Sequence, residues 1–170
     1  MHLRRHSAYN KSYTFYCLIP KHSSEAYWEE IEIGAMKAVE ARRDFYIDLE
    51  IMYYSRLDPH SFIETYQKCL RQNPDGVILV PTTLEVTRQF TDELHDRNIP
   101  FILLDSYMPS LQPLSFYGQD SIQSGRFAAR MLMLIAQKEE SIMLMKQTKD
   151  GKMASRQQEN REVGFRHYME

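Results

Sequence analysis

The sequence predicts an α/β fold built on a doubly wound parallel sheet. Strand-like and helix-like patterns alternate from about residue 13 to residue 136, and most of the segments that join them are short. Hydrophobic residues make up 43% of the 170 residues and charged residues 26%, which is typical of a chain that buries a core. We therefore expect one lobe and part of another.

Five short apolar or β-rich runs are the predicted strands of the first lobe. Each run ends or begins at a proline, a glycine or a polar turn, which are the residues that interrupt regular structure. The runs are residues 13–19, 49–54, 77–80, 101–104 and 114–117. Because helix-like segments separate them, we expect the strands to pair in parallel.

Apolar residues at helical spacing predict the helices between these strands. Trp28 and Ile31 lie on the apolar stripe of the first helix, and Phe90 lies on that of the third. Asp58 is the expected N-cap of the second helix, since a proline occupies the next position. A fourth helix is expected over residues 122–136.

A second lobe is expected to begin after residue 137. Residues 141–145 predict a strand, a polar stretch follows, and Val163, Phe165 and Tyr168 predict a last helix. One strand and one helix cannot bury both faces of a sheet, so we expect this lobe to be incomplete in the chain. The predicted organisation is a linker or tail over 1–12, an amino-terminal lobe over 13–137 and the start of a carboxyl-terminal lobe over 138–170.

Charge and motifs exclude several classes of function. A net charge of -2 gives this segment no basic surface for nucleic acid, and no run of about 18 apolar residues indicates a membrane span. Cys17 and Cys69 are expected as buried free thiols, which fits a reducing cytoplasm. Histidines and acids show no metal-ligand spacing, and P-loop, GxSxG and GxGxxG motifs are absent. We expect no enzyme, metal or cofactor.

Polar residues follow several of the predicted strands. Thr82 follows the third strand, Asp105 the fourth, and Gln119 and Asp120 the fifth. The carboxyl ends of parallel strands form the ligand crevice of such sheets, so these residues are candidate ligand contacts. Asp120 also fits the N-cap of the helix that follows, and its position favours the cap over a ligand contact. Asp105 equally fits a residue that braces its loop.

The order of several short segments resembles the effector-binding core of the lactose-repressor and galactose-repressor family of transcription regulators, which has the type I periplasmic-binding-protein fold. These segments are Pro20 followed by Tyr27, Trp28 and Gly34; residues 74–80 and 98–105; Gly118, Gln119 and Asp120 with Gly125; and residues 161–165. The resemblance covers residues 13–170. It implies a strand order of 2-1-3-4-5 and two lobes with a ligand between them.

The resemblance also implies ligand roles for particular residues. Asp120 and Arg161 match positions that hydrogen-bond sugar hydroxyls, and they would act from opposite lobes. Tyr27 or Trp28 would stack on a sugar ring, with His22 and Glu25 adding polar groups. Each of these residues also has a structural interpretation without a ligand. Trp28 fits the core and His22 a solvated loop. Glu25 fits the first turn of a helix, and Arg161 fits the surface of the last helix.

The function implied by the resemblance is the sensing core of a cytoplasmic, homodimeric transcription regulator that responds to a small-molecule effector of the carbohydrate class. DNA would be bound only through a helix-turn-helix domain that this chain does not contain. One alternative is a sugar-binding protein that serves an ABC transporter or a chemoreceptor. Another is a flavodoxin-like enzyme that binds a flavin or nucleotide, although residues 20–25 hold no glycine for a close phosphate contact.

Overall fold

The computed structural model describes residues 12–21, 26–56, 58–136, 141–146, 148–149, 152–153 and 156–170. The chain divides into two compact units, residues 1–117 and 118–170, called here the first unit and the second unit. Each unit is treated by itself.

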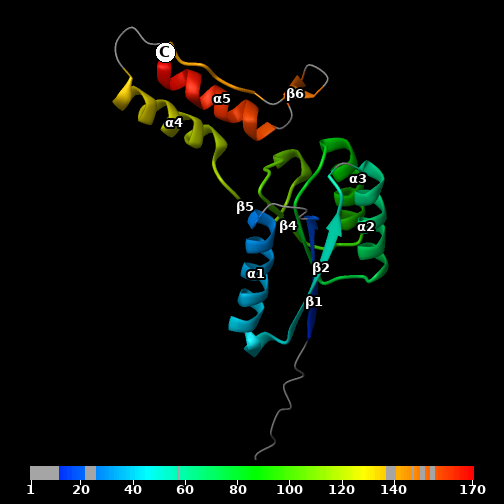
Figure 1. The fold of residues 1–170 in the computed structure, drawn as a ribbon. Coiled ribbons are helices and arrows are strands. Elements are labelled where there is room, and N and C mark those ends of the chain that lie inside the picture. Colours follow the sequence, from blue (N-terminus) through cyan, green and yellow to red (C-terminus); the bar gives the residue numbers. More distant parts are fainter. Residues whose placement is uncertain are drawn as a thin grey trace, which may run out of the picture. The chain divides into compact units, whose positions relative to one another are not determined.

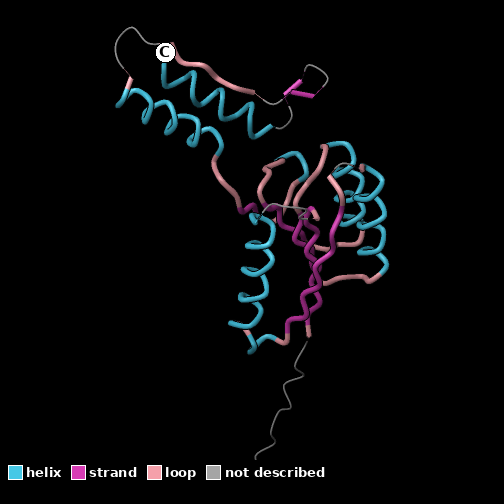
Figure 2. Tube along the Cα trace, viewed as in Figure 1, coloured by secondary structure: helices cyan, strands magenta, loops and turns pink. Residues whose placement is uncertain are grey.

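The first unit is built on a five-stranded parallel sheet (Figures 1 and 2). Its strands are β1 (Tyr13–Pro20), β2 (Ile47–Tyr54), β3 (Gly76–Leu79), β4 (Phe101–Leu104) and β5 (Ser115–Tyr117). They lie in the order β2-β1-β3-β4-β5, and every neighbouring pair is parallel. The predicted fold class and strand order are therefore confirmed.

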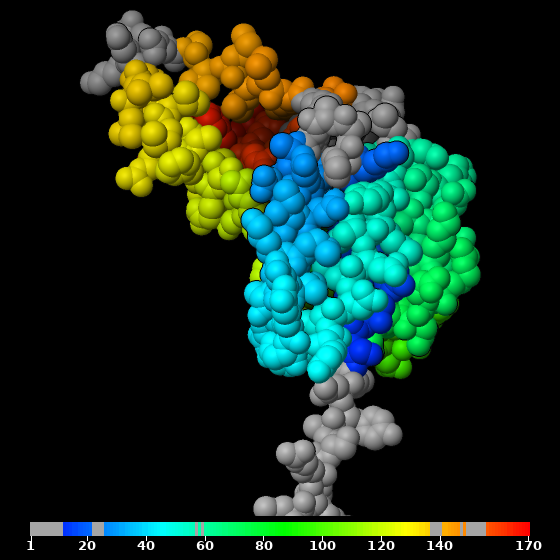
Figure 3. All heavy atoms as spheres, turned by 60° about the horizontal axis from the view of Figure 1, so that its bottom comes forward, coloured from blue at the N-terminus to red at the C-terminus, as the bar shows by residue number. Residues whose placement is uncertain are grey.

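Helices cover both faces of this sheet. α1 (Ala26–Ala41) lies on one face, and α2 (Pro59–Arg71) and α3 (Leu84–Asp96) lie on the other (Figure 1). Two short 3₁₀ helices, η1 (Arg43–Phe45) and η2 (Pro109–Leu111), complete the unit. In the space-filling view of Figure 3, light-blue atoms of α1 and cyan atoms of η1 and β2 lie together at the surface.

The side chains of β1 point alternately to the two faces of the sheet, and each face has its own core cluster. Leu18 is buried in the larger cluster, together with Phe62 of α2 and Phe90 of α3. Ile19, on the opposite face, is buried in the smaller cluster with Trp28 of α1. Successive residues of a strand point to opposite faces, so the apolar run of β1 supplies both clusters.

The predicted N-cap of α2 is present. The Asp58 side chain accepts a hydrogen bond of 2.9 Å from the His60 backbone N–H, and a proline stands in the first turn. The cap satisfies one of the backbone donors that a helix start leaves unpaired, and proline has no N–H to satisfy. The helix therefore begins where the sequence predicts.

The second unit contains two packed helices, α4 (Ser121–Ile135) and α5 (Arg156–Met169). A small antiparallel pair, β6 (Thr148–Lys149) with β7 (Lys152–Met153), lies within the stretch expected to be merely polar. The first lobe was expected to extend to residue 137. In the structure the division falls after Tyr117, because α4 packs against α5.

Residues 141–145 do not form the expected strand. The structure gives residues 141–146 no regular secondary structure, and in the described part of the second unit only β6 and β7 pair as strands. A β-strand is defined by backbone hydrogen bonds to a neighbouring strand, and an apolar run without such a neighbour has none to make. An apolar run alone therefore does not specify a strand at residues 141–145.

Candidate functional site

Asp105 organises the polar groups at the carboxyl end of β4. Its Oδ1 atom accepts a hydrogen bond of 3.0 Å from the Tyr27 hydroxyl, at the start of α1. Its Oδ2 atom accepts one of 3.1 Å from the Ser106 hydroxyl. The carboxylate thus joins α1 to the loop after β4, at the edge of the sheet where ligands of such folds bind.

The backbone of Asp105 is in the left-handed region, with φ of 64°. Aspartate is one of the few residues other than glycine that adopt this conformation at modest cost. The Asp105 N–H donates to the Tyr117 carbonyl oxygen at 2.9 Å, and this bond fixes the loop to β5. The turn therefore depends on the residue type at position 105 as well as on its hydrogen bonds.

Tyr27 and Trp28 have different surroundings despite being neighbours. The Tyr27 side chain is 51% exposed, whereas Trp28 is 3% exposed and belongs to the core cluster beneath α1. Their rings meet edge to face with centroids 4.8 Å apart. Partial burial and the Asp105 carboxylate raise the pKa of Tyr27, so its hydroxyl stays a hydrogen-bond donor. Of these two rings, Tyr27 is the one accessible to a ligand.

Arg56 belongs to the same edge of the sheet, although it was not among the candidate residues predicted from the sequence. Its guanidinium carbon lies 4.6 Å from the centroid of the Trp28 ring, a cation–π geometry. Arg56 follows β2 almost directly, so the rule that selected Asp105 after β4 would also have selected it. The edge of the sheet that carries the Tyr27–Asp105 pair therefore also carries the Arg56 cation.

Thr82 follows β3 at the same edge, but its groups are engaged locally. Its backbone N–H donates to the Thr87 hydroxyl at 3.0 Å, and the two hydroxyl oxygens are 3.4 Å apart. Thr87 is fully buried in α3. These contacts shape the start of α3, a structural role that the sequence did not suggest.

Gln119, Asp120 and Arg161 all belong to the second unit, although Asp120 and Arg161 were expected to act from opposite lobes. The Arg161 guanidinium donates to the Gln119 side-chain oxygen at 3.1 Å. Asp120 is the N-cap of α4, since its side chain accepts from the Gln123 backbone N–H at 3.0 Å. The cap predicted for Asp120 is present, and its carboxylate still has a second oxygen with acceptor capacity.

Two glycines hold α4 and α5 close together. A side-chain carbon at Gly125 would overlap the backbone carbonyl of Arg161, and one at Gly164 would overlap that of Ile122. Each helix therefore presents a glycine to the other helix's backbone, and this contact sets the position of Arg161 beside the start of α4.

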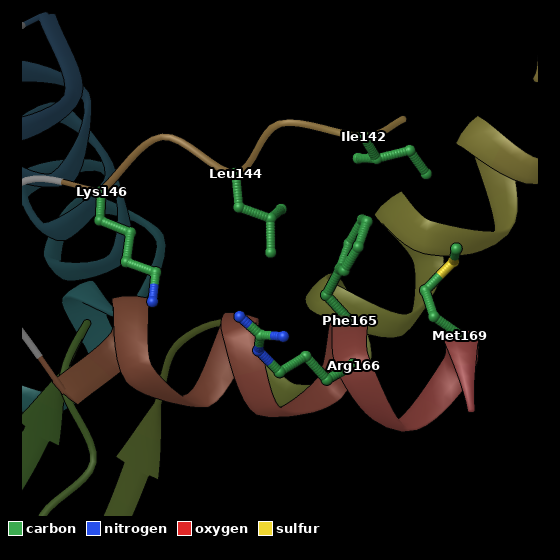
Figure 4. A pocket seen from close by; sticks show the side chains of 6 residues that line it. All are labelled: Ile142, Leu144, Lys146, Phe165, Arg166 and Met169. Carbon is green, nitrogen blue, oxygen red and sulfur yellow. The ribbon is translucent and has the colours of Figure 1, made fainter. Parts of the chain in front are cut away.

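A pocket of about 390 Å³ lies in the second unit between residues 142–146 and α5 (Figure 4). Ile142, Leu144, Phe165 and Met169 make it mainly apolar. At one end, Glu162 accepts hydrogen bonds from Lys146 at 2.7 Å and Arg166 at 2.8 Å, which lower its pKa. The cations lining the pocket are thus already paired, and the pocket offers apolar packing more than polar recognition.

His22 and Glu25 lie outside the described residues. Among the residues that the structure describes, no group of three or more His, Cys, Asp or Glu side chains could hold a metal ion. Within the same ranges, no helix has the length and apolar character needed to cross a bilayer.

Comparison with known proteins identifies the family. A model of the periplasmic binding protein domain matches residues 15–170. The chain belongs to this family. The resemblance to the periplasmic-binding-protein fold that the sequence predicts is thereby confirmed, and a comparison with curated proteins found no match.

Solved structures of this periplasmic-binding-protein fold include regulators and sugar-binding proteins. A putative LacI transcriptional regulator from Bacteroides fragilis is 45% identical, with 94% of this chain and 55% of that chain covered and a TM-score of 0.81. GanP, a glucose-galactose binding protein from Geobacillus stearothermophilus, is 22% identical, with 93% and 54% covered and a TM-score of 0.77. A periplasmic ribose ABC transporter protein from Conexibacter woesei is 19% identical, with 93% and 50% covered and a TM-score of 0.75. The chain spans about half the length of these proteins, and the last two show the fold alone.

Proposed function

We propose that this chain is the effector-sensing part of a LacI-type transcription regulator and that its effector is a carbohydrate. The observation that carries the proposal is the 45% identity, over 94% of this chain, to a putative LacI transcriptional regulator. The sugar-binding proteins named above share the fold at about half that identity or less. The role is one of binding, and no chemical step on the ligand is proposed.

The polar groups at the carboxyl edge of the first unit suit a polyol. Asp105 supplies a carboxylate that accepts hydrogen bonds from hydroxyl groups, and the half-exposed Tyr27 ring offers a flat apolar surface. A sugar ring has both hydroxyl edges and apolar C–H faces, so it is matched by this combination. These features support a carbohydrate over a purely apolar effector.

The second unit supplies further groups of the same chemistry. The Arg161 guanidinium offers several fixed donors, the Gln119 amide offers a donor and an acceptor, and Asp120 offers a carboxylate. We propose that Asp120 and Arg161 contact the effector in addition to their structural roles. His22 and Glu25 remain proposed contacts from the resemblance to the family.

Effector binding would act on DNA through a shift of conformational populations. An effector that binds one arrangement of the regulator more tightly moves the equilibrium toward it by the difference in affinity. DNA affinity then changes by the same coupling free energy, typically about 1–3 kcal/mol. Homodimerisation, a cytoplasmic location and DNA contact through a helix-turn-helix domain outside this chain are parts of the proposal.

The second candidate is a sugar-binding protein of an ABC transporter or chemoreceptor. The likeness in fold to GanP and to the ribose transporter protein favours it. The two candidates differ in what the encoded polypeptide carries before residue 13: a helix-turn-helix domain for a regulator, or an export signal for a binding protein.

DNA binding by the full-length encoded polypeptide tests the proposal. Fluorescence anisotropy with DNA from upstream of its own gene would be measured across a series of monosaccharides, oligosaccharides and sugar acids. The proposal expects specific DNA binding whose affinity changes about fivefold or more with one carbohydrate. Export of the polypeptide from the cytoplasm, or DNA affinity that no carbohydrate alters, would favour the second candidate.

A further inference from the structure

Two basic residues follow the adjacent strands β1 and β2. Arg56 comes shortly after Tyr54, the last residue of β2, and Lys21 comes directly after β1. The Lys21 backbone N–H donates to the Tyr54 carbonyl oxygen at 2.8 Å, which ties the ends of the two strands together. Both basic residues are exposed. They therefore place positive charge at the carboxyl edge of the sheet, where ligands of such folds bind.

The Arg56 guanidinium has a defined position although the residue is exposed. Its carbon lies 4.6 Å from the centroid of the Trp28 ring, and Trp28 is 3% exposed, so the cation rests on a ring that belongs to the core. The same tryptophan meets the Tyr27 ring edge to face. A guanidinium stacked on an aromatic ring loses less freedom when it forms further hydrogen bonds. The cation is thus oriented before a ligand binds.

The charges of Arg56 and Asp105 act on the same tyrosine hydroxyls. Burial and the Asp105 carboxylate raise the pKa of Tyr27, and the Arg56 charge opposes this rise. Burial also raises the pKa of Tyr54, where Arg56 again lowers the value and Asp105 raises it. Charges in salt solution act appreciably only over short distances. Arg56 and Asp105 therefore belong to one electrostatic neighbourhood at the carboxyl edge.

No acidic side chain forms an ion pair with Arg56 in the part of the chain that the structure describes. Asp105 accepts hydrogen bonds from the Tyr27 and Ser106 hydroxyls. Asp58, the acid nearest to Arg56 in the sequence, caps α2. A guanidinium is a strong donor to carboxylate and phosphate groups, which it binds through two parallel hydrogen bonds. An oriented guanidinium without an acid partner is suited to an anionic group of a ligand.

We propose that Arg56 makes the effector site selective for an acidic carbohydrate, whose carboxylate or phosphate group binds the guanidinium. This inference rests on the proposed function, because it names the class of carbohydrate bound at the same site. β1 and β3 lie between β2 and β4 in the sheet, so Arg56 and Asp105 follow different parts of the carboxyl edge. A sugar acid or a sugar phosphate offers an anionic group to Arg56 and hydroxyl groups to Asp105. A neutral sugar offers only the hydroxyl groups.

Calorimetric titration of the full-length encoded polypeptide with matched sugars tests this inference. Each acidic sugar is compared with its neutral parent: glucuronate with glucose, galacturonate with galactose, and a glucose phosphate with glucose. For at least one of these comparisons, the wild type is expected to bind the acidic sugar at least about tenfold more tightly than the parent. The uronates and the phosphate show which anionic group the site recognises.

Substitutions of Arg56 should change this preference. Arg56→Gln is expected to weaken binding of the preferred acidic sugar about tenfold or more, because the amide has no charge, and to change the affinity for the neutral parent less than about twofold. Arg56→Lys keeps the charge without the planar fork, so an intermediate affinity is expected. Arg71→Gln is the matched control and is expected to change neither affinity. Arg71 is an exposed arginine in the last turn of α2, the end of that helix that leads to the start of β3.

The ratio of the two affinities separates a charge contact from a role in folding, because a damaged fold weakens binding of both sugars alike. Thermal melting of each variant shows whether the fold is kept. Equal affinity of the wild type for every acidic sugar and its parent, or an unchanged ratio in Arg56→Gln, would overturn this inference and leave the proposed function standing. Absence of binding by any carbohydrate would overturn both.

Discussion

The Tyr27 hydroxyl donates a hydrogen bond of 3.0 Å to the Asp105 carboxylate, 78 positions along the chain. This bond joins the first turn of α1 to the loop after β4 at the carboxyl edge of the sheet. Because Asp105 also holds a left-handed backbone conformation, the position combines a polar contact with a conformational requirement. It is the residue around which the candidate site of the first unit is arranged.

Substitutions at Asp105 should separate these two roles. Asp105→Ala is expected to be about 1 kcal/mol less stable than Asp105→Gly, because glycine adopts a positive φ without a steric penalty and alanine does not. Urea denaturation monitored by Trp28 fluorescence reports the first unit, since Trp28 is the single tryptophan. Equal stability of the two variants would show that the backbone at this position is not strained.

Two glycine substitutions should have opposite effects. Gly125→Ala is expected to destabilise the helix pair by about 1–3 kcal/mol or more, because the added carbon overlaps the Arg161 carbonyl. Gly34→Ala in α1 is the control, since nothing lies within 4 Å of its added carbon. Gly34→Ala is expected to stabilise the folded protein by about 0.5–1 kcal/mol, because alanine favours a helix more than glycine does. Far-UV circular dichroism during thermal unfolding measures both, and a neutral Gly125→Ala would argue against the close α4–α5 contact.

Trp28 and Tyr27 should differ sharply in their contributions to stability. Trp28→Ala is expected to cost about 3–5 kcal/mol, because it empties a buried site beneath α1. Tyr27→Phe removes one partly exposed hydrogen bond and is expected to cost about 0.5–1.5 kcal/mol. Denaturation followed by circular dichroism compares them. Similar costs would mean that Trp28 is more accessible than the structure indicates.

The two cysteines should be unreactive in the folded protein. Burial raises the pKa of Cys17 and of Cys69 to about 12, so almost no thiolate forms near neutral pH. A thiol reagent such as dithionitrobenzoate is expected to react with both only after denaturation. Fast reaction without denaturant would show that these positions open.

The raised pKa values of Cys17 and Cys69 also predict that the folded protein loses stability at alkaline pH. The unfolded thiols have an ordinary pKa of 9.0, whereas the pKa of the folded thiols is about 12. Unfolded chains therefore lose protons first as the pH rises. This contribution to stability is fully present below pH 9.0 and is lost as the pH rises toward 12. Denaturation midpoints of the wild type and of a double variant, Cys17→Ala with Cys69→Ala, measured between pH 9.0 and 12, give the contribution of the two thiols to stability.

Local patterns predicted the strands of the first unit and the helix starts at Asp58 and Asp120, because these features depend on residues close in the sequence. Asp58 and Asp120 were recognisable as caps from their position before helical stripes, and both accept the expected backbone hydrogen bonds. Long-range pairing was harder to predict. The strand expected over 141–145 depends on a neighbouring strand, and the contact of Arg161 with Gln119 depends on how α4 and α5 pack. Neither can be read from spacing alone.

Calorimetric titration with carbohydrates tests the central claim most directly. Monosaccharides, oligosaccharides and sugar acids would be titrated into the wild-type protein and into Asp105→Asn, Asp120→Asn and Arg161→Gln. Asparagine keeps the left-handed turn at position 105 and the helix cap at position 120, so these two changes remove charge with little change of fold. Asp92→Asn, at an exposed position of α3, is the control. We predict saturable binding of at least one carbohydrate, weakened about tenfold or more by the site variants and unchanged by Asp92→Asn. Absence of carbohydrate binding, or equal binding by the site variants and the control, would contradict the account.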